Sequence, residues 1–146
     1  MKNTIKCLVL NAFLLGAFAA AALGQTLPEG EWRLVAYDFT GKVAYPVDKV
    51  KITLNVHTTG KLGGNSGCNV YGGNHDIEDG KLKISDIIST MRACDEPAPQ
   101  FERQFFDTLT AADGFTLEQG TLTITDAKTK NFLRFVEVKR SAPNKC

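Results

Sequence analysis

The groups in this 146-residue chain that could do chemistry are two histidines, four cysteines and several hydroxyl side chains. Neither His57 nor His75 stands at a metal-site spacing from a second histidine or from a cysteine pair. Cys68 and Cys94 each lack the neighbouring cysteine that is typical of a zinc site. The sequence therefore predicts no metal site and no cofactor.

The sequence also lacks a pattern that supports nucleophilic catalysis. Ser66, His75 and Asp76 could be drawn as a hydrolase triad, but Ser66 is not part of a nucleophile-elbow motif. The pair His75-Asp76 is more typical of the start of a strand. Gly63-Gly64 lacks the lysine and the following helix of a phosphate-binding loop. We therefore expect no catalytic residues and no enzyme activity.

A glycine-rich run surrounds Cys68 and extends from Gly63 to Gly73. Glycine reaches positive φ without steric cost, and asparagine tolerates it better than most residues. The run therefore predicts a bulged turn between strands rather than the interior of a strand. We expect Asn65, Asn69 and Tyr71 to form an exposed edge of this turn, which is a candidate binding edge.

The first 24 residues have the composition of an export signal. Lys2 and Lys6 precede a nearly unbroken apolar run that ends in small residues at Gly24. No basic stop-transfer cluster follows, and position 25 is Gln where a lipoprotein would need cysteine. We expect residues 1–24 to be a cleaved signal peptide and residues 25–146 to form a secreted or periplasmic domain without a membrane span. An uncleaved membrane anchor is the alternative.

Size and charge restrict the class of the mature protein. Removing 24 of the 146 residues leaves 122, which is one domain with room for a hydrophobic core. Two of the 17 basic residues leave with the signal, so 15 basic residues stand against 16 acidic ones and the net charge is about −1. This balance argues against nucleic acid or an anionic membrane as a partner.

Beyond the signal, apolar and polar residues alternate with a period of two. The clearest examples run from Trp32 to Ala36 and from Ile52 to Val56. The pattern predicts a mainly β (α+β) single domain, an antiparallel sheet curled into a partial or closed β-barrel. Shorter segments repeat the alternation at Leu82–Ile84, Phe115–Leu117, Leu122–Ile124 and Phe132–Val136.

One helix is predicted before the last three strands. Phe101, Phe105 and Leu109 recur at intervals of four and predict a stripe that faces the core. Asp95 is expected to cap the helix, and the prolines that follow suit its first turn. Asp113-Gly114 is expected to end it. Three polar side chains of the helix are expected to face away from the core: Glu102, Arg103 and Asp107.

Several motifs follow one another in a characteristic order. They are Gly30-x-Trp32-x-Leu34, Gly67-Cys68-Asn69-x-Tyr71-x-Gly73, the segment from Thr90 to Cys94, and Glu102-x-x-Phe105-Phe106-x-x-Leu109, followed by three closing strands. Together they resemble the META domain, or HslJ-like, family over nearly all of the mature chain. The family more usually has methionine directly before Ala-Cys, whereas Arg92 stands there in this chain, after Met91. A lipocalin also begins its barrel with Gly-x-Trp, but its helix lies near the end.

The two motifs that carry Cys68 and Cys94 predict a disulfide bond between them in an oxidising compartment. The bridge would close a loop of 26 residues, for which the chain-entropy model gives roughly 3 to 4 kcal/mol of stabilisation. Buried free cysteines that pack as small hydrophobic groups are the alternative. Cys146 is then left over, and we expect it to be free, capped or joined to a second chain in a disulfide-linked dimer.

The resemblance implies a small non-catalytic domain that takes part in stress tolerance of the cell envelope or extracellular space, or in interaction with a host. The alternative is a secreted protease inhibitor or a small-ligand-binding protein. Such a protein would use the loop from Gly63 to Gly73 or the segment from Asp95 to Gln100 as a rigid binding edge. In either case the partner is an unidentified protein or small ligand.

Overall fold

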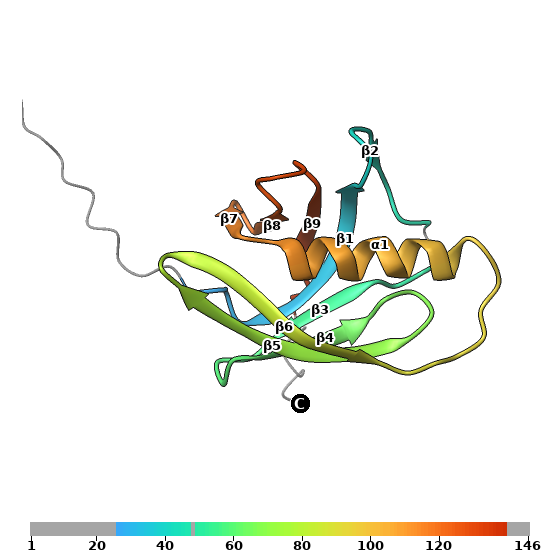
Figure 1. Cartoon of the computed structure of the whole chain (residues 1–146), viewed down its shortest axis with the longest axis horizontal. Coiled ribbons are helices and arrows are strands. Elements are labelled where there is room, and N and C mark those ends of the chain that lie inside the picture. Colours follow the sequence, from blue (N-terminus) through green and yellow to red (C-terminus); the bar gives the residue numbers. More distant parts are fainter. Residues whose placement is uncertain (1–25, 48, 140–146) are drawn as a thin grey trace, which may run out of the picture.

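The computed structural model describes residues 26–47 and 49–139, which form nine strands and one helix (Figure 1). The expected signal peptide, residues 1–24, and Cys146 lie outside the described residues. The elements are β1 (Gly30–Asp38), β2 (Val43–Ala44), β3 (Thr53–Val56), β4 (Lys61–Asn65), β5 (Val70–Glu78), β6 (Lys81–Ser89), α1 (Ala98–Ala111), β7 (Gly114–Glu118), β8 (Thr121–Thr125) and β9 (Phe132–Glu137).

The strands pair antiparallel in one sheet with the order β6-β5-β4-β3-β1-β9-β8-β7, and the short β2 pairs with β1. The first strand of the chain is therefore central. The meander β3 to β6 lies on one side of it, and the last three strands lie on the other. The predicted mainly β fold, with one helix before the last three strands, is confirmed.

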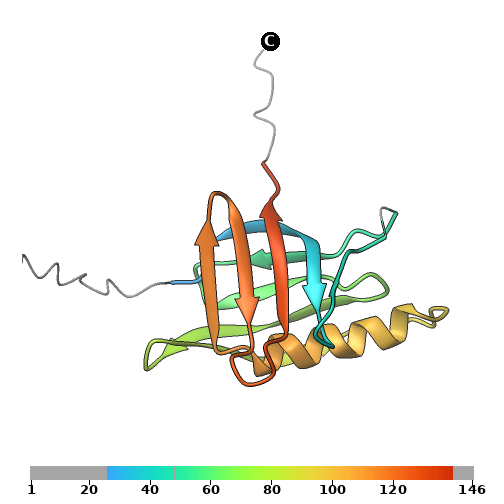
Figure 2. The same cartoon turned by 90° about the horizontal axis from the view of Figure 1, so that it is seen from above.

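The strand β1 belongs to both halves of the sheet. Its first residues pair with β3, as in Trp32 opposite Leu54, and its later residues pair with β9, with a register shift between Leu34 and Ala36. A bulge of this kind bends a strand and increases its twist. In Figure 2, β7 to β9 run across the direction of β3 to β6. The sheet is therefore curled into a half-barrel, which is the partial form of the predicted barrel.

The helix α1 lies along the open side of this curled sheet (Figures 1 and 2) and packs against β6 and β9. Phe105 and Leu109 are fully buried, as their spacing predicts. The two ends of the sheet approach each other where the Leu82 N–H donates to the Asp113 carbonyl oxygen at 3.1 Å. No helix within residues 26–47 and 49–139 is long and apolar enough to cross a membrane.

The start of α1 differs from the prediction in its cap. The N-cap residue is Pro97, and no side chain caps the helix. Asp95 contributes its backbone carbonyl oxygen, which accepts a hydrogen bond from the Ala98 N–H at 3.1 Å. The expected side-chain cap is therefore wrong, because the backbone turn already supplies the acceptor.

Most of the glycine-rich run lies in strands, so the predicted long turn is wrong. The turn is confined to residues 66–69, between β4 and β5. A Cβ at Gly64 would lie 2.1 Å from the Thr53 carbonyl oxygen, so the close approach of two strands requires glycine there. Gly67 lies in the turn itself with φ of 100°, which favours glycine. Glycine thus allows two strands to approach closely at Gly64 and allows a positive φ at Gly67. The sequence pattern indicated only the second of these.

Cys68 and Cys94 form a disulfide bond with a Cα–Cα distance of 6.1 Å, which confirms the predicted pairing. Cys68 is buried in the turn between β4 and β5, and Cys94 lies in the segment that leads from β6 to α1. The bond therefore joins the turn to the chain just before the helix. Such a bond is typical of an oxidising compartment.

Reduction of this bond should destabilise the protein, because the bridge restricts 26 residues of the unfolded chain. We expect the free energy of unfolding to fall by about 2 to 5 kcal/mol. Urea unfolding with and without dithiothreitol measures the change. The double variant Cys68→Ser, Cys94→Ser should be insensitive to the reductant, whereas Cys146→Ser should respond like the wild type. Loss of the response in Cys146→Ser would contradict the assignment.

Candidate functional site

The turn between β4 and β5 is tied to α1 by hydrogen bonds to the carboxylate of Glu102. The side-chain amide of Asn69 donates to Oε1 of Glu102 at 2.8 Å. The backbone N–H of Asn69 lies 3.2 Å from Oε2. The Ser66 hydroxyl also donates to Oε2. Glu102 is half-buried and points to the turn, so the prediction that it faces away from the core is wrong. Helical periodicity identified the apolar stripe but not the polar partner beside it.

The other side of the Asn69 amide holds the segment that carries Cys94. The Asn69 side-chain oxygen accepts hydrogen bonds from the Thr90 hydroxyl and from the Arg92 backbone N–H, both at 2.8 Å. Ser66, Asn69, Thr90, Glu102 and the Arg92 backbone are called the Asn69 network below. The Arg92 side chain is exposed, and only its backbone N–H bonds to Asn69. The arginine that replaces the family's usual methionine therefore does not change this hydrogen bond.

The predicted binding edge is not an exposed edge. Asn69 and Tyr71 are only 5% and 4% exposed, and Asn65 is half-buried. The Tyr71 hydroxyl donates to the Thr53 carbonyl oxygen at 3.0 Å, and its ring packs edge-on against Phe105. Burial raises the pKa of Tyr71 far above its usual value, so the phenol stays uncharged. These side chains point inward because the turn is short and β5 places Tyr71 on its core side.

The structure does not bring Ser66, His75 and Asp76 together as a triad. The Ser66 hydroxyl belongs to the Asn69 network, whereas His75 Nε2 lies 3.0 Å from the His57 carbonyl oxygen. His75 and Asp76 line a separate polar hollow on β5 and β6. Within residues 26–47 and 49–139, no group of three or more histidine, cysteine or acidic side chains is placed to hold a metal ion.

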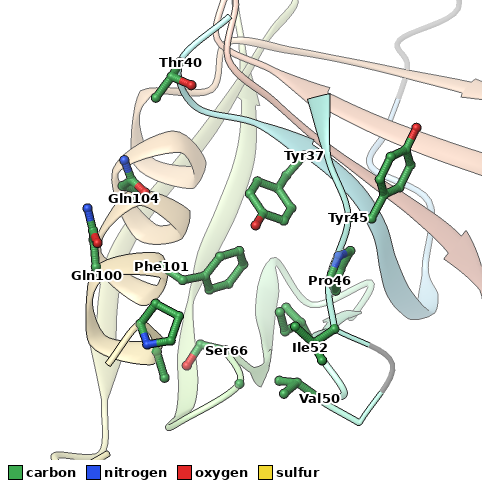
Figure 3. Close-up of a pocket in the computed structure, with 14 residues that line it drawn as sticks. Tyr37, Thr40, Tyr45, Pro46, Val50, Ile52, Ser66, Gln100, Phe101 and Gln104 are labelled. Carbon is green, nitrogen blue, oxygen red and sulfur yellow. The ribbon is translucent and has the colours of Figure 1, made fainter. Parts of the chain in front are cut away.

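A cleft of about 440 Å³ lies beside the Asn69 network, between the first turns of α1, the end of β1 and the chain that follows β2 (Figure 3). Its lining is mainly apolar. The lining residues come from four separate segments of the chain. Two of these belong to the possible binding edges named from the sequence, the loop Gly63–Gly73 and the segment Asp95–Gln100. No local pattern indicated that they meet the end of β1 and the chain after β2. The main apolar lining residues are Tyr37, Pro46, Val50, Ile52, Ala98 and Phe101.

One wall of the cleft is an aromatic cluster anchored in the core. The ring centroids of Phe101 and Tyr37 lie 5.0 Å apart in an edge-to-face arrangement, and Phe39 lies 5.6 Å from Phe101. Phe101 also stacks on the buried Phe105 at 5.9 Å. Such contacts hold aromatic rings in defined orientations. The wall is therefore preformed.

The remaining walls are held together by the disulfide bond and the Asn69 network. Ser66 and Gly67 line the cleft from the turn, while Pro97 and Ala98 line it from the start of the helix. The Cys68–Cys94 bond joins the residues next to these two walls, and Glu102 joins the helix to Ser66. The shape of the cleft thus depends on the disulfide bond and on the hydrogen bonds of the Asn69 network.

Removing the carboxylate should destabilise this arrangement. In Glu102→Ala, the buried side-chain amide of Asn69 loses its oxygen acceptor, and the Ser66 hydroxyl keeps only the Asn69 carbonyl oxygen. We expect the free energy of unfolding to fall by about 1 to 3 kcal/mol, measured by urea unfolding. Asp107→Ala is the matched control, because Asp107 is an exposed acid on the same helix, and it should change stability by less than about 0.5 kcal/mol. Equal effects of the two variants would show that the network is not stabilising.

Comparison with solved structures finds proteins of the same fold. A protein from Burkholderia xenovorans, solved by NMR, is 28% identical to this chain with a TM-score of 0.65, over 77% of this chain and 83% of its own. A DUF4847 family protein from Bacteroides vulgatus ATCC 8482 is 12% identical with a TM-score of 0.55, over 77% of this chain and 95% of its own, and is similar in fold alone. Comparison with curated proteins gives no match.

The family model for the META domain matches residues 25–139, which include every strand and the helix described above. The match agrees with the motifs around the two bonded cysteines. This chain belongs to the META domain family.

Proposed function

We propose that this protein is an exported, non-catalytic binding module whose cleft takes up a small apolar ligand. In this proposal it acts in the cell envelope or the extracellular space, where it contributes to stress tolerance or to interaction with a host by binding such a compound. The observation that carries the proposal is the cleft between α1 and the chain after β2.

The cleft has the properties of a small-molecule site. Ligand pockets commonly have volumes of roughly 300 to 1,000 Å³ and are lined by apolar side chains with a few polar groups. Here about 440 Å³ is lined by aromatic and branched aliphatic side chains, with hydroxyl groups at Tyr37 and Ser66. Exposed apolar side chains also gather beside it, since Tyr45 is 72% and Val47 is 71% exposed. Apolar surface of this kind usually marks a binding site.

Two observations support a role in binding rather than catalysis. The Ser66 hydroxyl at the cleft donates to Glu102, so its proton is held by a structural acceptor. Neither histidine lines the cleft, so Ser66 has no imidazole base beside it there. The small-ligand-binding alternative raised by the sequence therefore has a site to support it. The protease-inhibitor alternative has less support, because Cys68, Asn69 and Tyr71 in the proposed inhibitory loop are buried.

The proposed location rests on the disulfide and on the composition of residues 1–24. A disulfide bond such as that between Cys68 and Cys94 is typical of proteins that fold outside the reducing cytosol. The full chain, expressed in a host with an export pathway, should be recovered outside the cytoplasm with an N-terminus near Gln25. Intact-mass measurement identifies the N-terminus. Recovery of a chain that retains residues before Leu23 would contradict this expectation.

Ligand uptake can be tested with N-phenyl-1-naphthylamine, an uncharged dye that fluoresces when it enters an apolar site. The wild type should bind it, and Val50→Asp should weaken binding about tenfold or more, because the new carboxylate places an unpaired charge in the apolar cleft. Val50 is 38% exposed, so the substitution should leave the fold intact.

Val70→Asp is the matched control for this measurement, since Val70 is 56% exposed on β5 and does not line the cleft. It should bind the dye like the wild type. An equal loss in both variants, or no binding by the wild type, would show that the cleft is not the binding site.

A further inference from the structure

The lining of the cleft is uncharged. Of its lining residues within the described part of the chain, none is lysine, arginine, histidine, aspartate or glutamate. An ionised group that entered the cleft would lose hydration and would find no opposite charge to replace it. The lining therefore favours a ligand without a charge.

The two sides of the cleft differ in shape. Phe101 and Tyr37 present rings on one side, and these rings are fixed by edge-to-face contact with each other and by Phe39. Val50 and Ile52 present branched aliphatic groups on the other side (Figure 3). Aromatic rings prefer offset-stacked or edge-to-face neighbours, and their faces also pack on aliphatic groups. A flat ring system is complementary to this space.

The Tyr37 hydroxyl faces the space between these sides, and the other polar lining residues include Thr40 after β1 and Gln100 and Gln104 on α1. Figure 3 shows the Tyr37 hydroxyl directed toward Phe101 and Ile52, into the cleft. The Ser66 hydroxyl, by contrast, already donates to Glu102, and the Tyr45 side chain is 72% exposed and directed away from the cleft. Tyr37 is therefore placed to exchange a hydrogen bond with a ligand at the centre of the apolar site.

We infer that the ligand is an uncharged aromatic molecule that carries a hydroxyl or carbonyl group, with its ring between Phe101 and Ile52 and its polar group bonded to the Tyr37 hydroxyl. This inference rests on the proposed function, since it names the ligand class of the same cleft. It excludes carboxylates such as fatty acids as preferred ligands, because the described lining residues include no lysine, arginine or histidine to pair with them.

Three compounds of similar size test the ligand class: 2-naphthol, 2-naphthoate and 2-methylnaphthalene. Each is titrated against the complex of the full mature protein with N-phenyl-1-naphthylamine, at neutral pH. We expect 2-naphthol to displace the dye at a concentration about tenfold or more below that of 2-naphthoate, because the carboxylate must be desolvated. Equal or tighter binding of 2-naphthoate would overturn the inference that the ligand is uncharged.

The variant Tyr37→Phe keeps the ring and removes the hydroxyl. It should weaken binding of 2-naphthol by about three- to tenfold, the effect of one hydrogen bond, and leave binding of 2-methylnaphthalene unchanged. Binding of 2-methylnaphthalene is the matched control for this variant, because this compound has no polar group that could bond the Tyr37 hydroxyl. Unchanged binding of 2-naphthol to Tyr37→Phe would overturn the role of this hydroxyl.

Two further outcomes show whether this inference fails alone or together with the proposed function. If the wild type binds the dye and Val50→Asp does not, but 2-naphthoate competes as well as 2-naphthol, the cleft remains the site and the ligand class is wrong. If N-acetyl-tyrosinamide, a mimic of a protein side chain, competes better than 2-naphthol, the occupant is an aromatic residue of a protein partner and the small-molecule class is overturned.

Discussion

The carboxylate of Glu102 is the group on which the arrangement of this site depends. A carboxylate that is partly withdrawn from water needs hydrogen-bond donors, and charge-assisted bonds are the strongest that a protein can offer. The turn between β4 and β5 supplies them from Asn69 and Ser66. The side-chain N–H of the buried Asn69 in turn needs an oxygen acceptor, which Oε1 of Glu102 provides. Both needs are met when the helix docks on the turn, so the two elements fix each other in place.

The half-barrel explains why the cleft lies where it does. Because β1 bends at its bulge, the last three strands cross the direction of the others and leave one side open for α1. The stripe on the helix is fully buried at Phe105 and Leu109 but only half-buried at Phe101. The first turns of α1 thus extend beyond the closed part of the core, and the chain after β2 forms the opposite wall there.

The fold and the function of this domain are determined by different parts of the molecule. Proteins with as little as 12% identity share the curled sheet, whose core is built from alternating apolar residues that many sequences can supply. The cleft instead depends on particular side chains, such as Tyr37 and Phe101, at the rim of that core. A shared fold therefore carries little information about the ligand, and the chemistry of the lining carries more.

The sequence by itself determined most of the strands, the helix and its apolar stripe, because period-two and period-four patterns arise from local geometry that each segment carries with it. It missed the strands of the glycine-rich run, where no such alternation is present. The motifs around Cys68 and Cys94 also indicated their pairing correctly. Only the tertiary structure decided that Glu102 points inward, that Asn69 and Tyr71 are buried, and that a cleft exists. Each of these features depends on a contact between segments that lie far apart in the chain. Such contacts form when the helix docks on the turn, and no local sequence pattern encodes them.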